Sequence, residues 1–153
     1  MTPVAEVIGA VVEALRSIPE LVELVGGDAE TGIYAQAADE QARDLSESIN
    51  IMPTPAVMVV WDGIASAQLG HVTRLGHQVS ILLRLDIPQQ YHLAVAAILD
   101  GVPENLSGGL PFLTADIHPD LVMAGVPTFG RLLDAEGTEM WQMTLPPLIE
   151  AGA

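Results

Sequence analysis

The sequence predicts an α+β domain in which a mixed or antiparallel sheet carries two main helices on one face. Its segments follow the order helix, strand, strand, helix, strand, hairpin, and consecutive strands are close enough to be joined as hairpins. Helical segments are too few to cover both faces of a doubly wound parallel sheet. The 153 residues, half of them apolar, suffice for one core, so we expect a single domain over 1–153.

The first helix is predicted by apolar residues that recur at steps of four and three: Val4, Ile8, Val11, Leu15 and Ile18. We expect Thr2 to cap it, with Pro3 in its first position. A Ser-x-x-Glu capping box at Ser17 and Glu20 predicts a second, short helix that ends at Gly26-Gly27.

The next segments predict two short elements and an arm. Ile33-Tyr34 is compatible with a short strand. Residues 35–54 are polar, weakly patterned and longer than an ordinary connection, so we expect a protruding loop or arm between the first helix and the first long strand. Ala56 to Trp61 then predicts a buried strand followed by a turn at Asp62-Gly63.

A second long strand is predicted from His77, with His71 to Leu75 as an outward extension. Its side chains alternate, with Val79, Ile81, Leu83 and Leu85 on the core face and Gln78, Ser80, Leu82, Arg84 and Asp86 on the other.

Pro88 opens the second main helix, over Gln89 to Asp100, and Gly101 is placed to close it. Its expected apolar face is Leu93, Ala94, Ala97 and Ile98, with Tyr91 as a further candidate. A strand is predicted at Phe112 to His118, and a terminal hairpin is predicted from Thr128 to Leu133 and Thr138 to Leu148 around the turn Asp134 to Gly137.

Composition excludes several kinds of chemistry. Twenty acidic residues stand against five basic ones, a net charge of −15, which opposes tight binding of nucleic acid. The absence of cysteine excludes disulfides, thiolate zinc sites and a cysteine nucleophile, and the absence of lysine excludes Schiff-base catalysis. No apolar run reaches the roughly 20 residues of a membrane span, and the start is not a basic signal peptide, so we expect a soluble, intracellular chain with no membrane partner.

Motifs for catalysis or cofactor binding are not found. The sequence has no Gly-x-Gly-x-x-Gly, Gly-x-x-x-x-Gly-Lys, His-Glu-x-x-His or Gly-x-Ser-x-Gly. A metal site at His118 and Asp120 is less favoured than a turn, and calcium at Asp39, Glu40 and Asp44 is less favoured than a solvated loop, because the calcium-loop pattern is missing. We therefore predict no catalytic residue, no metal and no cofactor.

The start of the chain, Ala14 to Gly27 followed by Ile33-Tyr34, resembles the opening of tail terminator and related head-to-tail joining (neck) proteins of long-tailed bacteriophages. The later order of elements agrees with this resemblance, although residues 35–54 and 102–127 are longer than is usual there. The resemblance implies a non-enzymatic virion protein of the tail or neck, assembled in the host cytoplasm. Such a protein forms a homo-oligomeric ring, commonly a hexamer, that caps the tail tube, with the tail tube protein and a neck or head-completion protein as partners. DNA would pass through this ring without specific binding, and acidic side chains lining the bore would help it pass.

Candidate contact residues are therefore surface residues. The first is the loop 35–54 with Arg43 and Asp44, followed by the strand tip from Ser66 to Arg74 and the turn with Asp134 and Glu136. Arg84 and Arg131 lie on strands among many acids and are expected to form ion pairs, within the chain or across a subunit boundary.

Three alternatives stay open at this stage. One is a head-completion or adaptor protein of the same neck. Another is a small acidic cytosolic enzyme or ligand-binding domain with a pocket between the 89–101 helix and the sheet. The third is a partner protein whose first helix docks its apolar stripe into another protein's groove.

Overall fold

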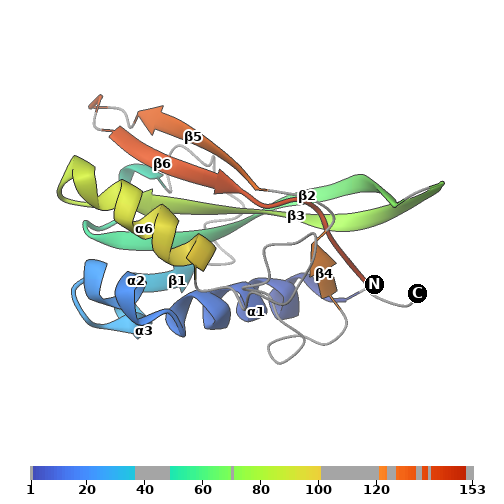
Figure 1. Cartoon of the computed structure of the whole chain (residues 1–153), viewed down its shortest axis with the longest axis horizontal. Coiled ribbons are helices and arrows are strands. Elements are labelled where there is room, and N and C mark those ends of the chain that lie inside the picture. The colour runs from blue at the N-terminus through green and yellow to red at the C-terminus, as the bar shows by residue number, and fades with distance from the viewer. Residues whose placement is uncertain are drawn as a thin grey trace.

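The computed structural model describes residues 2–36, 49–69, 71–100, 121–123, 127–133, 136–137 and 139–150. Over these residues the chain is an α+β fold with helices packed against a mixed sheet (Figure 1). The helices are α1 (Val4–Arg16), α2 (Pro19–Leu24), α3 (Ala29–Gly32) and α6 (Pro88–Asp100), and the strands are β1 (Ile33–Ala35), β2 (Ala56–Leu69), β3 (Val72–Arg84), β4 (Leu121–Met123), β5 (Thr128–Leu133), β6 (Glu139–Thr144) and β7 (Leu148–Glu150).

The strand order is β1-β2-β3-β6-β5, with β7 beside β3 and β4 beside β7. β1 runs parallel to β2 and the other pairs are antiparallel. Of the predicted mixed or antiparallel sheet, the mixed form is the one present, and the predicted C-terminal hairpin is confirmed as β5–β6. The second arm of that hairpin is shorter than expected. It ends at Thr144 because Pro146 and Pro147 have no N–H to continue the ladder, and β7 begins only at Leu148.

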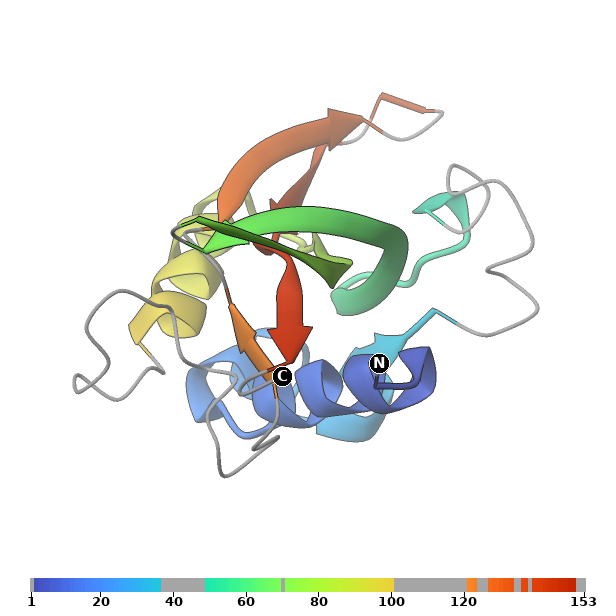
Figure 2. The ribbon, with the colours of Figure 1, turned by 90° about the vertical axis from the view of Figure 1, so that its right-hand side faces the viewer.

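One face of the sheet carries the main core. The stripe of α1 packs there, with Val7, Ile8, Val11 and Leu15 buried against Val57, Val59, Val79 and Ile81. Figure 2 shows α1 running below the strands with α6 beside them. The apolar stripe of the first helix is thus used within its own domain, and the alternative that it docks into another protein is wrong.

α6 meets the sheet through Tyr91, Ala94 and Ile98, which are buried at steps of three and four residues. The prediction that Leu93 belongs to this face is wrong, since its side chain is 60% exposed. The rotation of α6 follows from Tyr91, whose hydroxyl lies 3.0 Å from both the Leu85 nitrogen and the Glu139 carbonyl oxygen. Binding these backbone groups turns Leu93 outward.

The opposite face is also covered over its middle, although its alternating polar residues suggested a more open surface. Ile49 and Met52 pack there on Met58, Leu82 and Met140. Arg84, which is 8% exposed, holds this segment in place because its guanidinium donates to the carbonyl oxygens of Ile49 and Met52 at 3.1 and 2.9 Å.

The expected turn at Asp62-Gly63 is a β-bulge within one long strand. The register with β3 shifts between Trp61 and Gly63, and Gly63 has a φ of 127°, which favours glycine. Asp62 is the extra residue, and its carboxylate accepts a hydrogen bond from Ser80. Because the bulge changes the alternation, Ile64 returns to the face that Trp61 occupied.

Both predicted helix caps are wrong in detail. α1 begins at Val4 after Pro3, and no side chain caps it. The carbonyl of Thr2 instead meets Nε2 of the buried His77 at 2.9 Å. The Ser17 hydroxyl donates back to the Ala14 carbonyl and closes α1, while Ile18 precedes α2.

The predicted break after the second helix is confirmed, because Gly26 and Gly27 have φ values of 91° and 84°. Most of the predicted arm (37–48), Gly101 and the predicted strand at 112–118 lie outside the described residues.

Candidate assembly surfaces

β2 and β3 extend beyond the core as a two-stranded ribbon (Figure 1). Ile64, Val72 and Leu75 are 46%, 53% and 61% exposed along it. The register pairs Ile64 with His77 and Ser66 with Leu75, so Ile64 and Leu75 share one face. A two-stranded ribbon gains little stability alone, and these exposed apolar side chains make it a candidate contact surface.

β5 is the last strand in the order of the sheet, and no described residue pairs with its outer edge. Phe129 and Leu133 are 41% and 70% exposed on it. They lie on the α6 side of the sheet, since they pair with Met143 and Glu139. Edge strands are usually protected by charge, and Arg131 is the single charged residue of β5.

Arg131 is held within the chain by an aromatic cluster. Its Nε lies 3.3 Å from Oε1 of Glu139, and its guanidinium lies 5.6 Å from the centre of the Trp141 ring. The indole N–H of Trp141 donates to the same Glu139 oxygen at 3.0 Å. The ring of Tyr91 stacks on the ring of Trp141 with 5.5 Å between their centres, and the rings of His92 and Trp141 meet edge to face with 5.1 Å between their centres. These contacts join β5, β6 and α6 just behind the open edge.

The other predicted contact residues are dispersed. Arg74 is partly buried in β3 near the ribbon tip and has an interaction within the chain. Arg84 is buried, as described above, and Glu136 is exposed in the turn where Gly137 has a φ of 83°. Arg43, Asp44 and Asp134 lie outside the described residues. Contacts of these residues with other chains stay a prediction.

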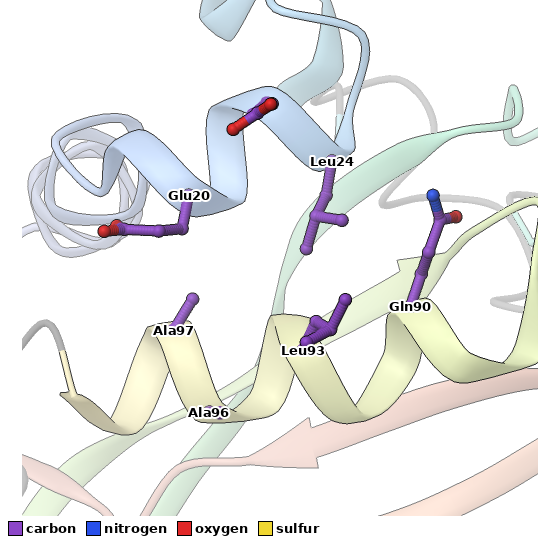
Figure 3. A pocket seen from close by; sticks show the side chains of 7 residues that line it. Glu20, Leu24, Gln90, Leu93, Ala96 and Ala97 are labelled. Carbon is purple, nitrogen blue, oxygen red and sulfur yellow. The ribbon is translucent and has the colours of Figure 1, made fainter.

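A groove of about 750 Å³ lies between α2 and α6 (Figure 3). Its lining residues are Glu20, Glu23, Leu24, Gln90, Leu93, Ala96 and Ala97. The rival interpretation placed a pocket between the second main helix and the sheet, but Tyr91, Ala94 and Ile98 bury that side of α6. Gln90, Leu93 and Ala97 follow one another at steps of three and four residues, and this spacing is the sequence signal that they share the face of α6 directed at α2.

Two hydrogen-bonded pairs of polar side chains lie on opposite faces of the sheet: Asp62 with Ser80 on one face, and Trp61 with His77 on the other. Burial raises the pKa of Asp62, and the hydrogen bond from Ser80 opposes this rise. On the core face the indole of Trp61 donates to Nδ1 of His77 at 3.1 Å, so the ring proton is on Nε2 and is directed at Thr2. Ser80 and His77 therefore do not form a proton relay.

Within the described residues, no three His, Cys, Asp or Glu side chains are grouped so that they could hold a metal ion. None of the helices described is long and apolar enough to cross a membrane. No known family model matches the chain, and it has no significant match among curated proteins or solved structures.

Proposed function

We propose that this chain is a virion structural protein of the tail terminator kind, which forms a ring on the end of a phage tail tube and joins it to the neck. The order of its elements supports the resemblance: α1, α2, β1, the long β2–β3 pair, α6 and the hairpin β5–β6. In this role the protein acts through shape and assembly, without catalysis.

The observation that carries the proposal is the apolar edge of β5, with which no strand in the described part of the chain pairs. A ring built from head-to-tail contacts needs two different surfaces on each subunit. The strand order puts β5 and β1 at opposite ends of the sheet, and β5 presents Phe129 and Leu133 to solvent. A neighbouring copy that contacts this edge covers both side chains and satisfies the outward backbone groups of the strand.

The ribbon of β2 and β3 supports a second contact, with a different partner. It leaves the core with Ile64 and Leu75 on one exposed face, and the tail tube protein is the partner that we propose for it. The net charge of −15 fits a channel protein that does not retain DNA, because Lys and Arg contacts with phosphate are what make non-specific binding strong.

Light scattering and electron microscopy of the purified protein test the proposal. We expect rings of uniform size that stop the elongation of tail tubes when added to tube protein. Leu133→Asp is expected to shift these rings toward monomer, whereas Leu93→Asp, which adds the same charge at another exposed leucine, is expected to leave them intact. A monomer that fails to cap tubes, or rings that are equally sensitive to both variants, would contradict it.

The head-completion or adaptor alternative uses the same surfaces and differs in its partners. Incubation with DNA-filled heads and with separated tails distinguishes the two: a terminator binds the tail end first, whereas an adaptor binds the head.

A further inference from the structure

We infer that the groove between α2 and α6 is a docking site for a segment of a different protein, one that presents aliphatic side chains flanked by Lys or Arg. This inference uses neither the open edge of β5 nor the ribbon, so it stands apart from ring formation.

The floor of the groove is apolar and is available to a partner. Leu93 projects from α6 toward α2, and Leu24 projects from α2 toward α6 (Figure 3). Leu93 is 60% exposed although the opposite face of the same helix is buried in the core. Ala96 and Ala97 beside it are small enough to let a backbone approach closely. A partner that inserts an aliphatic side chain here covers the exposed leucine.

The charged residues among the described lining of the groove are all acidic and lie on one side. Glu20 and Glu23 line it from α2, while the lining residues of α6 are uncharged. Among the residues that the structure describes, no cation lines the groove to balance these two carboxylates. A segment with aliphatic residues on one flank and Lys or Arg on the other therefore fits, with its cations toward α2.

A second copy of this chain is a poor source of those cations. The sequence has no lysine and only five arginines, and each of the four in its described part has an interaction within the chain. Arg16 donates to three backbone carbonyl oxygens at 2.9–3.1 Å, Arg84 binds two more, Arg131 pairs with Glu139, and Arg74 has its own interaction. The fifth, Arg43, lies outside the described residues. Each copy also carries a net charge of −15, so the acidic groove of one copy and the surface of another repel each other.

A displayed library of random 16-residue peptides, panned on the whole protein at low salt, tests the inference. We expect enriched peptides to combine Lys or Arg with Leu, Ile or Val. Their binding should be about five- to tenfold weaker to Glu20→Gln/Glu23→Gln, as expected for the loss of two exposed ion pairs, and should decline with added salt.

Two further variants separate docking in the groove from general attraction to an acidic protein. Glu13→Gln/Glu30→Gln removes the same charge from exposed positions outside the groove and should leave affinity within twofold. Leu93→Ser should reduce this affinity at least tenfold while circular dichroism stays unchanged, because Leu93 is outside the core.

Three properties of the enriched peptides would overturn the inference: equal binding to the groove variant Glu20→Gln/Glu23→Gln and the control variant Glu13→Gln/Glu30→Gln, unchanged binding to Leu93→Ser, or a lack of basic residues. The failure of any groove-dependent peptide to emerge would also overturn it. None of these results bears on ring size or tube capping, so failure of one proposal is distinguishable from failure of the other.

Discussion

Replacing Tyr91 with phenylalanine tests how α6 is joined to the sheet. The Tyr91 hydroxyl oxygen accepts a hydrogen bond from the Leu85 N–H at 3.0 Å, and the hydroxyl donates to the Glu139 carbonyl oxygen at 3.0 Å. One atom therefore joins the start of α6 to the end of β3 and the start of β6. The ring stacks on Trp141, and this contact is retained in the variant.

The size of the expected loss in stability follows from the two backbone groups that lose their partner, the Leu85 N–H and the Glu139 carbonyl. Each of the two hydrogen bonds contributes about 1 kcal/mol net, and leaving a buried backbone group unpaired adds to the cost. Tyr91 is only 3% exposed, so water does not replace the hydroxyl without rearrangement. We expect Tyr91→Phe to lower the free energy of unfolding by about 2–3 kcal/mol, which corresponds to a fall in Tm of roughly 4–12 °C in a domain of this size.

Urea unfolding followed by tryptophan fluorescence measures this change, with Tyr91→Leu as the variant that also loses the ring. Tyr91→Leu should be less stable than Tyr91→Phe, because it also loses the stack on Trp141. A loss below about 0.5 kcal/mol for Tyr91→Phe would show that the hydroxyl does not hold α6, and would refute the account of why Leu93 faces outward.

The same residue predicts a dependence on alkaline pH. Burial is the main cause that raises the pKa of Tyr91 above its ordinary value of 10.0, so the folded state favours the neutral phenol. Its contribution to stability is complete below pH 10 and is lost as pH rises through the higher pKa of the folded state. Tyr91→Phe should lack this alkaline loss, and the comparison of unfolding curves between pH 8 and 11 measures it.

The remaining predictions concern the sheet. Arg84→Met should lower the free energy of unfolding by about 2–4 kcal/mol, since two carbonyl groups of the 49–52 segment lose a charged donor. Proteolysis near Met52 should also become faster. Gly76→Ala should destabilise by about 1–3 kcal/mol, because a Cβ there lies 2.8–3.0 Å from atoms of the segment 147–149. Gly9→Ala, in the exposed middle of α1 with nothing within 4 Å, should instead stabilise by about 0.5–1 kcal/mol, and thermal unfolding of the pair checks both signs. Asp62→Asn should stabilise the fold at pH 7 and have no effect near pH 3. The raised pKa of Asp62 means that the folded state prefers the protonated carboxyl. The stability of the parent protein is therefore complete below the ordinary pKa of 3.8 and falls as pH rises, and the variant lacks this loss. Equal urea midpoints for Asp62→Asn and the parent across that range would contradict this.

Much of the fold was predictable because it depends on local periodicity. The helical stripe of α1 and the alternation of β3 each reflect a face that has to be buried, and both are confirmed by the core. The hairpin turn at Gly137 was predictable for a similar reason, since its positive φ suits glycine.

The candidate site was harder to predict, because exposure is a property of the assembled domain. Leu93 and Tyr91 are two residues apart on one helix, and either assignment satisfies the apolar pattern of the segment. The choice depends on backbone groups of β3 and β6 that the Tyr91 hydroxyl reaches. Likewise, nothing in β5 alone indicates that it lies at an edge, and the predicted pairing of Arg131 found its partner in Glu139 only once the hairpin register was known.

By itself, the sequence determined the class of fold, the order and type of most elements, and a strongly acidic surface, because periodicity, turn residues and charge are local properties of the chain. The tertiary structure decided which apolar residues remain outside, where β2 bulges, and that α2 and α6 enclose an acidic groove. Those outcomes depend on contacts between segments far apart in the chain, and the free energies that choose among them arise only when the segments are packed together.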